Sequence, residues 1–394
     1  MRQALRAFIL LLCAALLLGG CGQPGMPSEP QPSASAQPTA EPAAAPTAVP
    51  AVTTPEPTKE PGLTLWLAED APLGEALQAL AAQYNAQQPA MPVRVRSFAS
   101  EAALLTALTG AQPNLLLCGE RTSAALAAAD SLGTLAWPDE PTGLFRDVPG
   151  CADGGFFPLG AELRVLALRE ENQALLDGCD SLEALCETAA GYGRRQERPF
   201  FSADSFARLF ACAMAQKGAP FYAMREQDLE SEDYRSFYNL LAEAAFEGGL
   251  IPLEEAVLPV VRRGELVCGI CISCELLTGD REGLAALPLP PMAGCEALTD
   301  VKISGLAVLP GADPEGAARF IGWLHAEDRI AEAALAAGLI PAADGAWREA
   351  DAVSAGLALA LQNARFWLPP ENGGLLLHGA AFEQSFRAAL ALLG

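Results

Sequence analysis

Basic side chains are scarce in this chain. Its 394 residues hold 25 basic and 48 acidic side chains, which gives a formal net charge of −23. Lysine occurs only as Lys59, Lys217 and Lys302, and no basic cluster is larger than a pair of neighbouring arginines. Nucleic-acid binding needs clustered Lys and Arg to neutralise phosphates. The composition therefore predicts no nucleic-acid partner.

Histidine and the common catalytic motifs are also lacking. The two histidines, His325 and His378, are both interpreted as structural, His325 on the surface of an expected helix. The chain contains no P-loop, no GxGxxG after a strand, no HExxH and no GxSxG. Carboxylates are abundant, but no spacing singles out a glycosidase-type pair. We expect no enzyme, no catalytic residue and no cofactor.

Cysteine is not scarce, but its arrangement does not indicate a metal site. Of the eleven cysteines, nine lie beyond the N-terminal segment, an odd number that cannot all pair. Cys268, Cys271 and Cys274 are spaced like metal ligands. However, the surrounding residues 266–272 resemble a strand, which turns the first two side chains to opposite faces. No second CxxC follows, so we expect no metal, while free thiols and disulfides both stay open.

The N-terminal residues 1–20 read as a signal peptide. Arg2 and Arg6 precede an apolar stretch, residues 8–18, that is too short to span a bilayer. Leu18-Gly19-Gly20-Cys21 then resembles a bacterial lipobox, whose cysteine is lipidated. We expect export and anchoring to the outer face of the bacterial cell membrane through the lipid on Cys21. The alternative is an ordinary secretory signal in which Cys21 has no role.

Residues 21–62 are rich in Pro, Ala, Ser and Thr. Such a stretch cannot bury apolar surface, and proline favours extended segments. We interpret it as a tether that holds a folded domain away from the membrane.

The remainder alternates between strand and helix patterns. Strands are predicted at 63–67, 93–95, 114–118 and 163–168, and helices at 73–84, at 100–109 and from Asp313 to Gly338. Asp180 and Glu183 resemble a capping box that opens another helix. Strand and helix at this spacing predict an α/β fold with a mainly parallel sheet.

A series of short motifs in this part resembles the extracellular solute-binding proteins of family 1, the group of ABC-transporter proteins that includes maltose-binding lipoproteins. Each motif alone is weak, but they occur in the family's order and follow a lipobox and a tether. They are LTLWL at 63–67, LAAQYN at 80–85, VRV at 93–95, AQPNLLL at 111–117, FPLGA at 157–161, FEGGL at 246–250, RGELV at 263–267, LPLP at 287–290, SGLAV at 304–308, AARFI at 317–321 and GLIPA at 338–342.

The resemblance implies a two-lobe periplasmic-binding-protein-like fold of type II, in which each lobe is a mainly parallel sheet flanked by helices. The N-terminal lobe would comprise 63–159 and 296–342, and the C-terminal lobe 160–295 and 343–394. A monomer would bind a small solute in the cleft between the lobes, close, and dock on the transmembrane subunits of an ABC permease.

Ligand-binding residues are expected in the loops that follow strands and in segments that match the family's site. Trp66 and Arg121 are favoured, although packing or loop solvation is an alternative for every candidate. At Cys274 many relatives carry an aromatic residue that stacks on sugar. The full set is Trp66, Glu69, Asp70, Phe98, Glu120, Arg121, Phe157, Phe201, Asp204, Ser273, Cys274 and Glu275.

The function implied is capture of a solute, with a carbohydrate favoured, for an ABC importer. Aromatic residues make up only 7% of the chain, which is low for an oligosaccharide cleft, and acidic residues fit a cationic or polyol ligand as well. Two alternatives are a surface lipoprotein of the same fold that serves adhesion or sensing, and a glycan hydrolase.

Overall fold

The computed structural model describes residues 62–136, 143–196, 198–218, 231–368 and 374–393, without the side chains of Asp300 and of residues 374–378. These residues belong to one unit, Gly62–Gly394. The predictions for the signal peptide, Cys21, the tether and the His378 side chain lie outside the described residues. Within the described ranges, none of the helices combines the length and the apolar character needed to cross a bilayer.

The first lobe begins with the predicted alternation of strands and helices. Of the first three strands, the one that comes first in the sequence lies between the other two and pairs in parallel with both. The first helix buries Leu77, Leu80 and Tyr84, as its apolar spacing predicted, because these side chains share one helical face. The elements are β1 (Leu63–Ala68), α2 (Gly74–Gln87), β2 (Val93–Phe98), α3 (Glu101–Leu108), β3 (Leu115–Gly119) and α4 (Glu120–Ala128).

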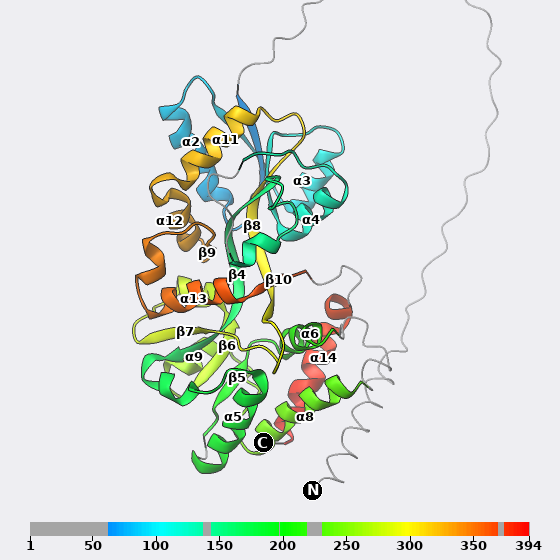
Figure 1. Ribbon diagram of the computed structural model, residues 1–394, viewed down its shortest axis with the longest axis vertical. Helices are drawn as coiled ribbons and strands as arrows, with labels where there is room; N and C mark the ends of the chain where they lie inside the picture. The colour runs from blue at the N-terminus through cyan, green and yellow to red at the C-terminus, as the bar shows by residue number, and fades with distance from the viewer. Residues whose placement is uncertain (1–61, 137–142, 197, 219–230, 369–373, 394) are drawn as a thin grey trace, which may run out of the picture. The chain divides into compact units, whose positions relative to one another are not determined.

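Two long strands, β4 (Phe156–Arg169) and β8 (Leu298–Val308), connect the lobes (Figure 1). The first half of β4 pairs with β8, and its second half pairs with β6 (Cys268–Ile272) and β7 (Leu284–Pro288). The upper end of β8 pairs with β3. One sheet path, β2-β1-β3-β8-β4-β6-β5, therefore passes through both lobes, and the predicted two-lobe α/β fold class is confirmed.

The strand directions differ from prediction in one respect. The outer strands of the sheet path do pair in parallel, β1 with β2 and β3, and β5 (Phe201–Ala203) with β6. Among the described strand pairs, however, all five antiparallel ones involve β4 or β8. β8 has one parallel partner as well, β10 (Arg365–Trp367). The expectation of a mainly parallel sheet in each lobe thus fits the outer strands and the β8–β10 pair, but not the other pairs of the two crossing strands.

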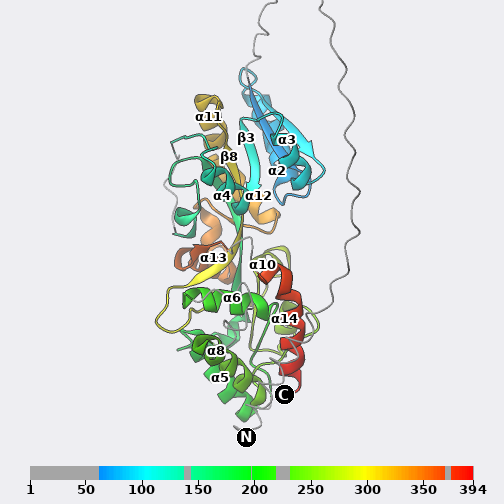
Figure 2. The same ribbon diagram turned by 90° about the vertical axis from the view of Figure 1, so that its right-hand side faces the viewer.

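The second lobe is built around aromatic packing between helices. Phe210 contacts Phe237, Phe382 and Phe386, with ring centroids 4.9, 5.3 and 5.2 Å away. Two of these partners lie on α14 (Gly374–Ala391), which runs alongside α6 and α8 (Figure 2). The helices of this lobe include α5 (Leu182–Gln196), α6 (Phe206–Gln216), α8 (Glu232–Phe246), α9 (Val257–Arg262) and α10 (Ser273–Thr278).

The capping prediction for α5 needs a correction. The Ser181 hydroxyl, not Asp180, accepts the hydrogen bond from the Ala184 amide, at 3.1 Å. The Glu183 carboxylate does not return to the cap but accepts from the Ala293 amide at 2.8 Å. Glu183 therefore joins α5 to the segment that leads into β8.

The single helix predicted from Asp313 to Gly338 is wrong. The chain forms α11 (Pro314–His325) and α12 (Arg329–Ala336), separated by Glu327 and Asp328 with left-handed φ of 57° and 56°. The Arg329 guanidinium donates to the carbonyls of Trp323 and Ala326, which satisfies the end of α11. Gly338, with φ of 74°, does follow the end of α12. The chain continues through β9 (Ile340–Pro341), α13 (Ala352–Asn363) and β10 (Arg365–Trp367).

Candidate functional site

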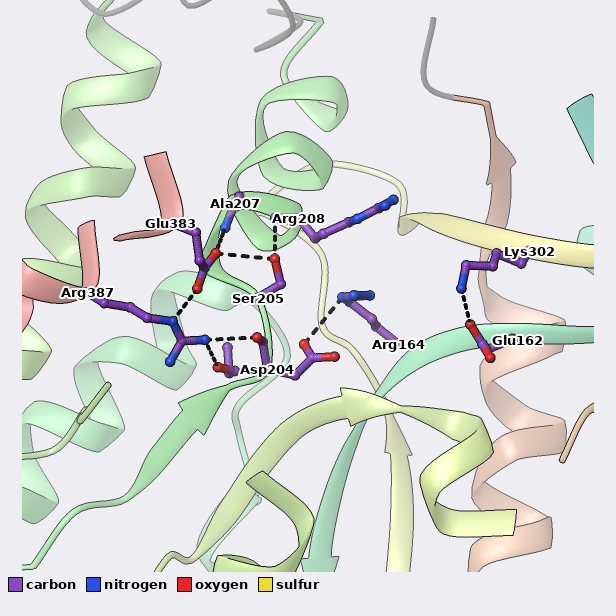
Figure 3. A network of polar contacts seen from close by, with 10 residues as sticks. Glu162, Arg164, Asp204, Ser205, Ala207, Arg208, Lys302, Glu383 and Arg387 are labelled. Carbon is purple, nitrogen blue, oxygen red and sulfur yellow. Dashed lines mark hydrogen bonds and ion pairs between the residues drawn. The ribbon is translucent and has the colours of Figure 1, made fainter. Parts of the chain in front are cut away.

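A group of charged side chains gathers where β4 changes its pairing partner from β8 to β6. Glu162 still faces Lys302 across the β4–β8 ladder, and Arg164 already faces Ile272 of β6. Strand residues two positions apart point to the same face, so Glu162 and Arg164 lie side by side. We call the following set the strand-crossing cluster, part of which Figure 3 shows: Glu162, Arg164, Asp204, Cys274, Glu275 and Lys302.

The most buried members of the cluster are Arg164 and Asp204. The Arg164 Nε lies 3.5 Å from the Asp204 Oδ1, and the two side chains are 9% and 15% exposed. Asp204 directly follows β5, and its amide donates to the Ile270 carbonyl at 2.9 Å. Removing one partner of an ion pair that is buried this far lowers the stability of a protein by several kcal/mol, about 3–5 in typical cases. Substitution of either partner should therefore destabilise the protein.

Cys274 and Glu275 lie in the first turn of α10, near this pair. Burial raises the pKa of the Glu275 carboxyl above its usual value, and the nearby Asp204 carboxylate raises it further. Burial, followed by the charge of Glu162, raises the pKa of the Cys274 thiol to about 11. The thiol is thus neutral near pH 7 and is a poor nucleophile there.

Glu120 approaches the cluster from the first lobe. It begins α4, and its Oε2 accepts from the amide of Ile303, the residue after Lys302, at 2.8 Å. Burial raises the pKa of this carboxyl as well. Arg121, the next residue, is half-buried. A carboxylate of the first lobe is therefore fixed to β8 next to Lys302.

Trp66 and Phe98 form a separate aromatic group. Their ring centroids lie 4.9 Å apart, and the Arg96 guanidinium lies 5.0 Å from the centre of the Trp66 ring and 4.7 Å from that of Phe98. Trp66 is 5% exposed and packs in an apolar core with Leu104. Its ring is therefore covered in this conformation.

The other candidates divide between core and surface. Phe157 and Phe201 are fully buried among apolar side chains. Ser273 is fully buried too, and its hydroxyl accepts from the Leu163 amide at 3.2 Å. Glu69 and Asp70 are exposed in the turn after β1. The structure thus brings Asp204, Cys274 and Glu275 into one cluster with Glu120 nearby, but it places the remaining candidates elsewhere or in the core.

Sequence reasoning missed the three residues that the crossing strands contribute: Glu162, Arg164 and Lys302. A signal for two of them exists in the sequence. The run Ala161-Glu-Leu-Arg-Val165 puts two charges at alternating positions inside an otherwise apolar strand. Charges in that position are almost never fully buried unless they are paired. The pattern could have marked one face of β4 as polar.

A surface hollow of about 970 Å³ lies apart from the cluster, between residues 127–136 and 146–155. Its charged lining residues are Asp130, Arg146 and Asp153, and none of the predicted site residues lines it. In the part of the chain that the structure describes, no group of three His, Cys, Asp or Glu residues is arranged to hold a metal ion. The cluster at the strand crossing remains the best candidate for a binding site.

No known protein-family profile matches the chain, and no curated protein is similar to it in sequence. Solved structures are similar in fold. An extracellular solute-binding protein of family 1 from Alicyclobacillus acidocaldarius is 15% identical with a TM-score of 0.65, and the match covers 84% of this chain and 93% of that one. The sugar-binding protein MalE from Xanthomonas citri is 15% identical with a TM-score of 0.62, over 84% and 95%.

The cyclic alpha-maltosyl-1,6-maltose binding protein from Arthrobacter globiformis is 16% identical with a TM-score of 0.57, over 84% of this chain and 94% of that one. All three structures carry the names of binding proteins. At such identities a likeness shows the fold alone. The chain has the two-lobe α/β fold of the maltose-binding-protein-like solute-binding proteins, as its sequence motifs predicted.

Proposed function

We propose that this protein captures a small solute between its two lobes and delivers it to an ABC importer. The observation that carries the proposal is the strand-crossing cluster, which lies where β4 passes from β8 to β6 between the lobes. Ligands of two-lobe α/β proteins bind where the lobes meet, and binding favours a closed form because the ligand then contacts both. We assign the lobes to 63–159 with 296–342 and to 160–295 with 343–394.

We propose a carbohydrate as the solute. Similar structures carry names that mention maltose, maltotetraose and acarbose. The cluster offers carboxylates at Glu162 and Glu275 and a guanidinium at Arg164, and charged groups make strong hydrogen bonds to hydroxyls. Phe98, which is half-buried, would add an aromatic surface once the Arg96 side chain moves aside.

We further propose that the mature protein is anchored to the outer face of the cell membrane by lipid on Cys21. The support is the order of positive residues, a short apolar run and Leu18-Gly19-Gly20-Cys21 in the sequence. Metabolic labelling with a fatty-acid analogue tests the anchor. The wild-type chain should carry label and sediment with membranes, and the Cys21→Ser variant should lose both properties. Label retained in the variant would contradict the proposal.

A thermal-shift and calorimetry panel tests solute capture. The panel contains maltodextrins, monosaccharides, polyols, polyamines and short peptides. A solute at about 100 times its Kd should stabilise the folded state by about 2.7 kcal/mol. Small-angle scattering should then report closure in the same sample. Stabilisation by a sugar would support the full proposal, and stabilisation by a polyamine only would replace the sugar.

No stabilisation by any solute, with unchanged scattering, would contradict solute capture and favour the adhesion or sensing alternative. Turnover of a glycan that disappears with a single carboxylate substitution would favour the hydrolase instead. Glu162→Gln is the matched site variant, because it keeps the size of a side chain in the cluster and removes its charge, while its pair with the exposed Lys302 contributes little stability.

A further inference from the structure

The last helix of the chain, α14, reaches the turn that carries Asp204. Glu383 and Arg387 lie one helical turn apart on α14, and the Arg387 Nε is 2.6 Å from the Glu383 Oε1. Their side chains are only 24% and 19% exposed for Arg387 and Glu383 respectively. Both point into the turn between β5 and α6, as Figure 3 shows.

Glu383 completes the N-terminus of α6. Its Oε2 accepts from the Ala207 amide at 2.7 Å and from the Ser205 hydroxyl at 3.2 Å. Ser205 is itself the N-cap of α6 and accepts from the Arg208 amide at 3.3 Å. A carboxylate is favourable here, since the first amides of a helix lack partners within the helix and carry a partial positive charge.

Arg387 fixes the other side of the same turn. Its guanidinium donates to the carbonyls of Leu253 at 2.6 Å, Ala203 at 3.1 Å and Asp204 at 2.8 Å. It also lies over the Phe206 ring, 5.2 Å from the centroid. With the bond from its Nε to Glu383, the guanidinium serves four acceptors, one more than the three N–H donors of an ammonium group can serve.

These contacts control where the Asp204 side chain lies. The Asp204 carbonyl is held by Arg387, its amide by the Ile270 carbonyl, and its carboxylate faces Arg164 of the strand-crossing cluster. A shift of the β5–α6 turn would therefore move the carboxylate relative to Arg164. Groups that bind a ligand must be held within about 0.5 Å of their productive geometry.

We propose that Glu383 and Arg387 of α14 are positioning residues for the solute site, which act by holding the Asp204 turn against Arg164. The proposal rests on the proposed function, because it assigns the site at the strand crossing a supporting element far along the sequence. It also implies that the site is complete only after the last helix has docked on the second lobe.

The partners of the two side chains differ in kind, and this distinguishes the positioning role from that of an ordinary ion pair. Glu383 faces hydrogen-bond donors, and Arg387 faces acceptors. Exchanging the two residues, E383R with R387E, keeps an ion pair within the helix but sets a guanidinium against the α6 amides and a carboxylate against carbonyls. The exchange E315R with R319E on α11 is the matched control, because that pair is exposed and also one helical turn apart, at 3.7 Å.

The first measurement is amide hydrogen exchange, which needs no solute. In the full chain, the double variant E383R/R387E should speed amide hydrogen exchange at Asp204, Ala207 and Arg208 at least about tenfold. The contacts that oppose local opening of this turn are lost in the variant, so opening costs less free energy. Amides of β1 serve as the internal reference and should not change. The milder E383Q variant, which keeps an acceptor for Ala207, should give a smaller change at the same amides.

The second measurement is affinity for maltotetraose, with chemical rescue. If the wild type binds this sugar, R387A should weaken binding at least about tenfold. Guanidinium added at millimolar concentration should restore part of the lost affinity of R387A. The R387K variant should bind the sugar as weakly as R387A. A purely structural role would lower stability without rescue of affinity.

The outcomes separate the two proposals. Unchanged exchange at Asp204 and Ala207 in the E383R/R387E variant, or equal changes in β1, overturns the positioning role whether or not a sugar binds. A wild type that binds no solute in the panel overturns the proposed function and, with it, the role of α14 in binding. Local exchange that changes together with sugar affinity supports both.

Discussion

Glu162 and Lys302 are cross-strand partners in the β4–β8 ladder, and their side chains form an ion pair with 3.0 Å between Nζ and Oε1. Lys302 is 71% exposed and Glu162 is 17% exposed, so the pair lies at the edge of the strand-crossing cluster with one partner in water. An exposed pair of this kind contributes little stability, about 0–1 kcal/mol. Both charges nevertheless act on the pKa of the neighbouring Cys274 thiol, which Glu162 raises and Lys302 lowers.

The Lys302→Gln variant should slow alkylation of Cys274. Lys302 lowers the pKa of this thiol against the effects of burial and Glu162, so its loss raises the pKa above about 11. The thiolate fraction at pH 9 then falls, and the thiolate is the reactive form. Iodoacetamide labelling followed by mass spectrometry of the Cys274 peptide gives the rate. Lys217→Gln is the control, and equal rates in the two variants would contradict the prediction.

The Ser273→Ala variant should destabilise the protein by about 1–3 kcal/mol, because it leaves the buried Leu163 amide without its acceptor. Chemical denaturation gives the free energy of unfolding. The control is Ser97→Ala on an exposed position of β2, which should change the free energy by less than about 0.5 kcal/mol. Equal values for both variants would show that the 3.2 Å contact does not matter for stability.

Two helical glycines should respond to alanine in opposite directions. A Cβ at Gly356 of α13 would lie 1.8 Å from the Ala286 carbonyl oxygen, so α13 must move off β7, at a cost of about 1–3 kcal/mol or more. A Cβ at Gly322 of α11 meets nothing within 4 Å. Gly322→Ala should therefore stabilise the protein by up to about 1 kcal/mol, as expected inside a helix.

Thermal and chemical denaturation of both glycine variants check this prediction. Stability equal to that of the wild type for Gly356→Ala would mean that α13 does not pack on β7 as closely as the structure indicates. Destabilisation by Gly322→Ala would contradict the open space beside α11.

The Glu275→Gln variant should be more stable than the wild type at neutral pH. Burial and Asp204 raise the pKa of the Glu275 carboxyl in the folded state above its value of 4.5 in an unfolded chain. A raised carboxyl pKa favours the folded state fully only below pH 4.5, and this contribution is lost as the pH rises through the folded-state pKa. Glutamine does not titrate, so the advantage of the variant should shrink toward pH 4.

Denaturant titrations at pH 7.5 and pH 4 give the two free-energy differences. A difference that stays constant over this range would show that Glu275 does not titrate differently in the folded and unfolded states. A difference that grows toward acidic pH would show that the pKa of Glu275 is lowered in the folded state, contrary to the prediction.

Much of the first lobe could be predicted from local pattern alone. The strands β1, β2 and β3 and the helices α2 and α3 lie where alternation and helical spacing placed them. The break between α11 and α12 could not be predicted in this way. Glu327 and Asp328 adopt left-handed backbone angles there, and Arg329 satisfies the freed carbonyls, which no periodic pattern records.

The candidate site shows the same division. Glu120 could be nominated because it follows a strand and strand ends collect at a lobe boundary, and Asp204 and Glu275 because they lie in segments that match the family's site. Phe157, before the predicted crossover, and Phe201, in a segment that matches the family's site, were nominated as well, yet both are fully buried in the core. A sequence motif gives the position of a residue along a strand, but neighbouring elements decide whether its side chain reaches water.

The sequence by itself determined the α/β class and the predictions of a signal, a tether and no nucleic-acid partner, because these depend on composition and on local periodicity. Only the tertiary structure decided that β4 exchanges β8 for β6 between Leu163 and Arg164, and that α14 returns from the end of the chain to hold the Asp204 turn. Glu162 and Lys302 are 140 positions apart in the chain, and their contact depends on strand register. Register is set by the packing of the whole sheet, which no local stretch of sequence contains.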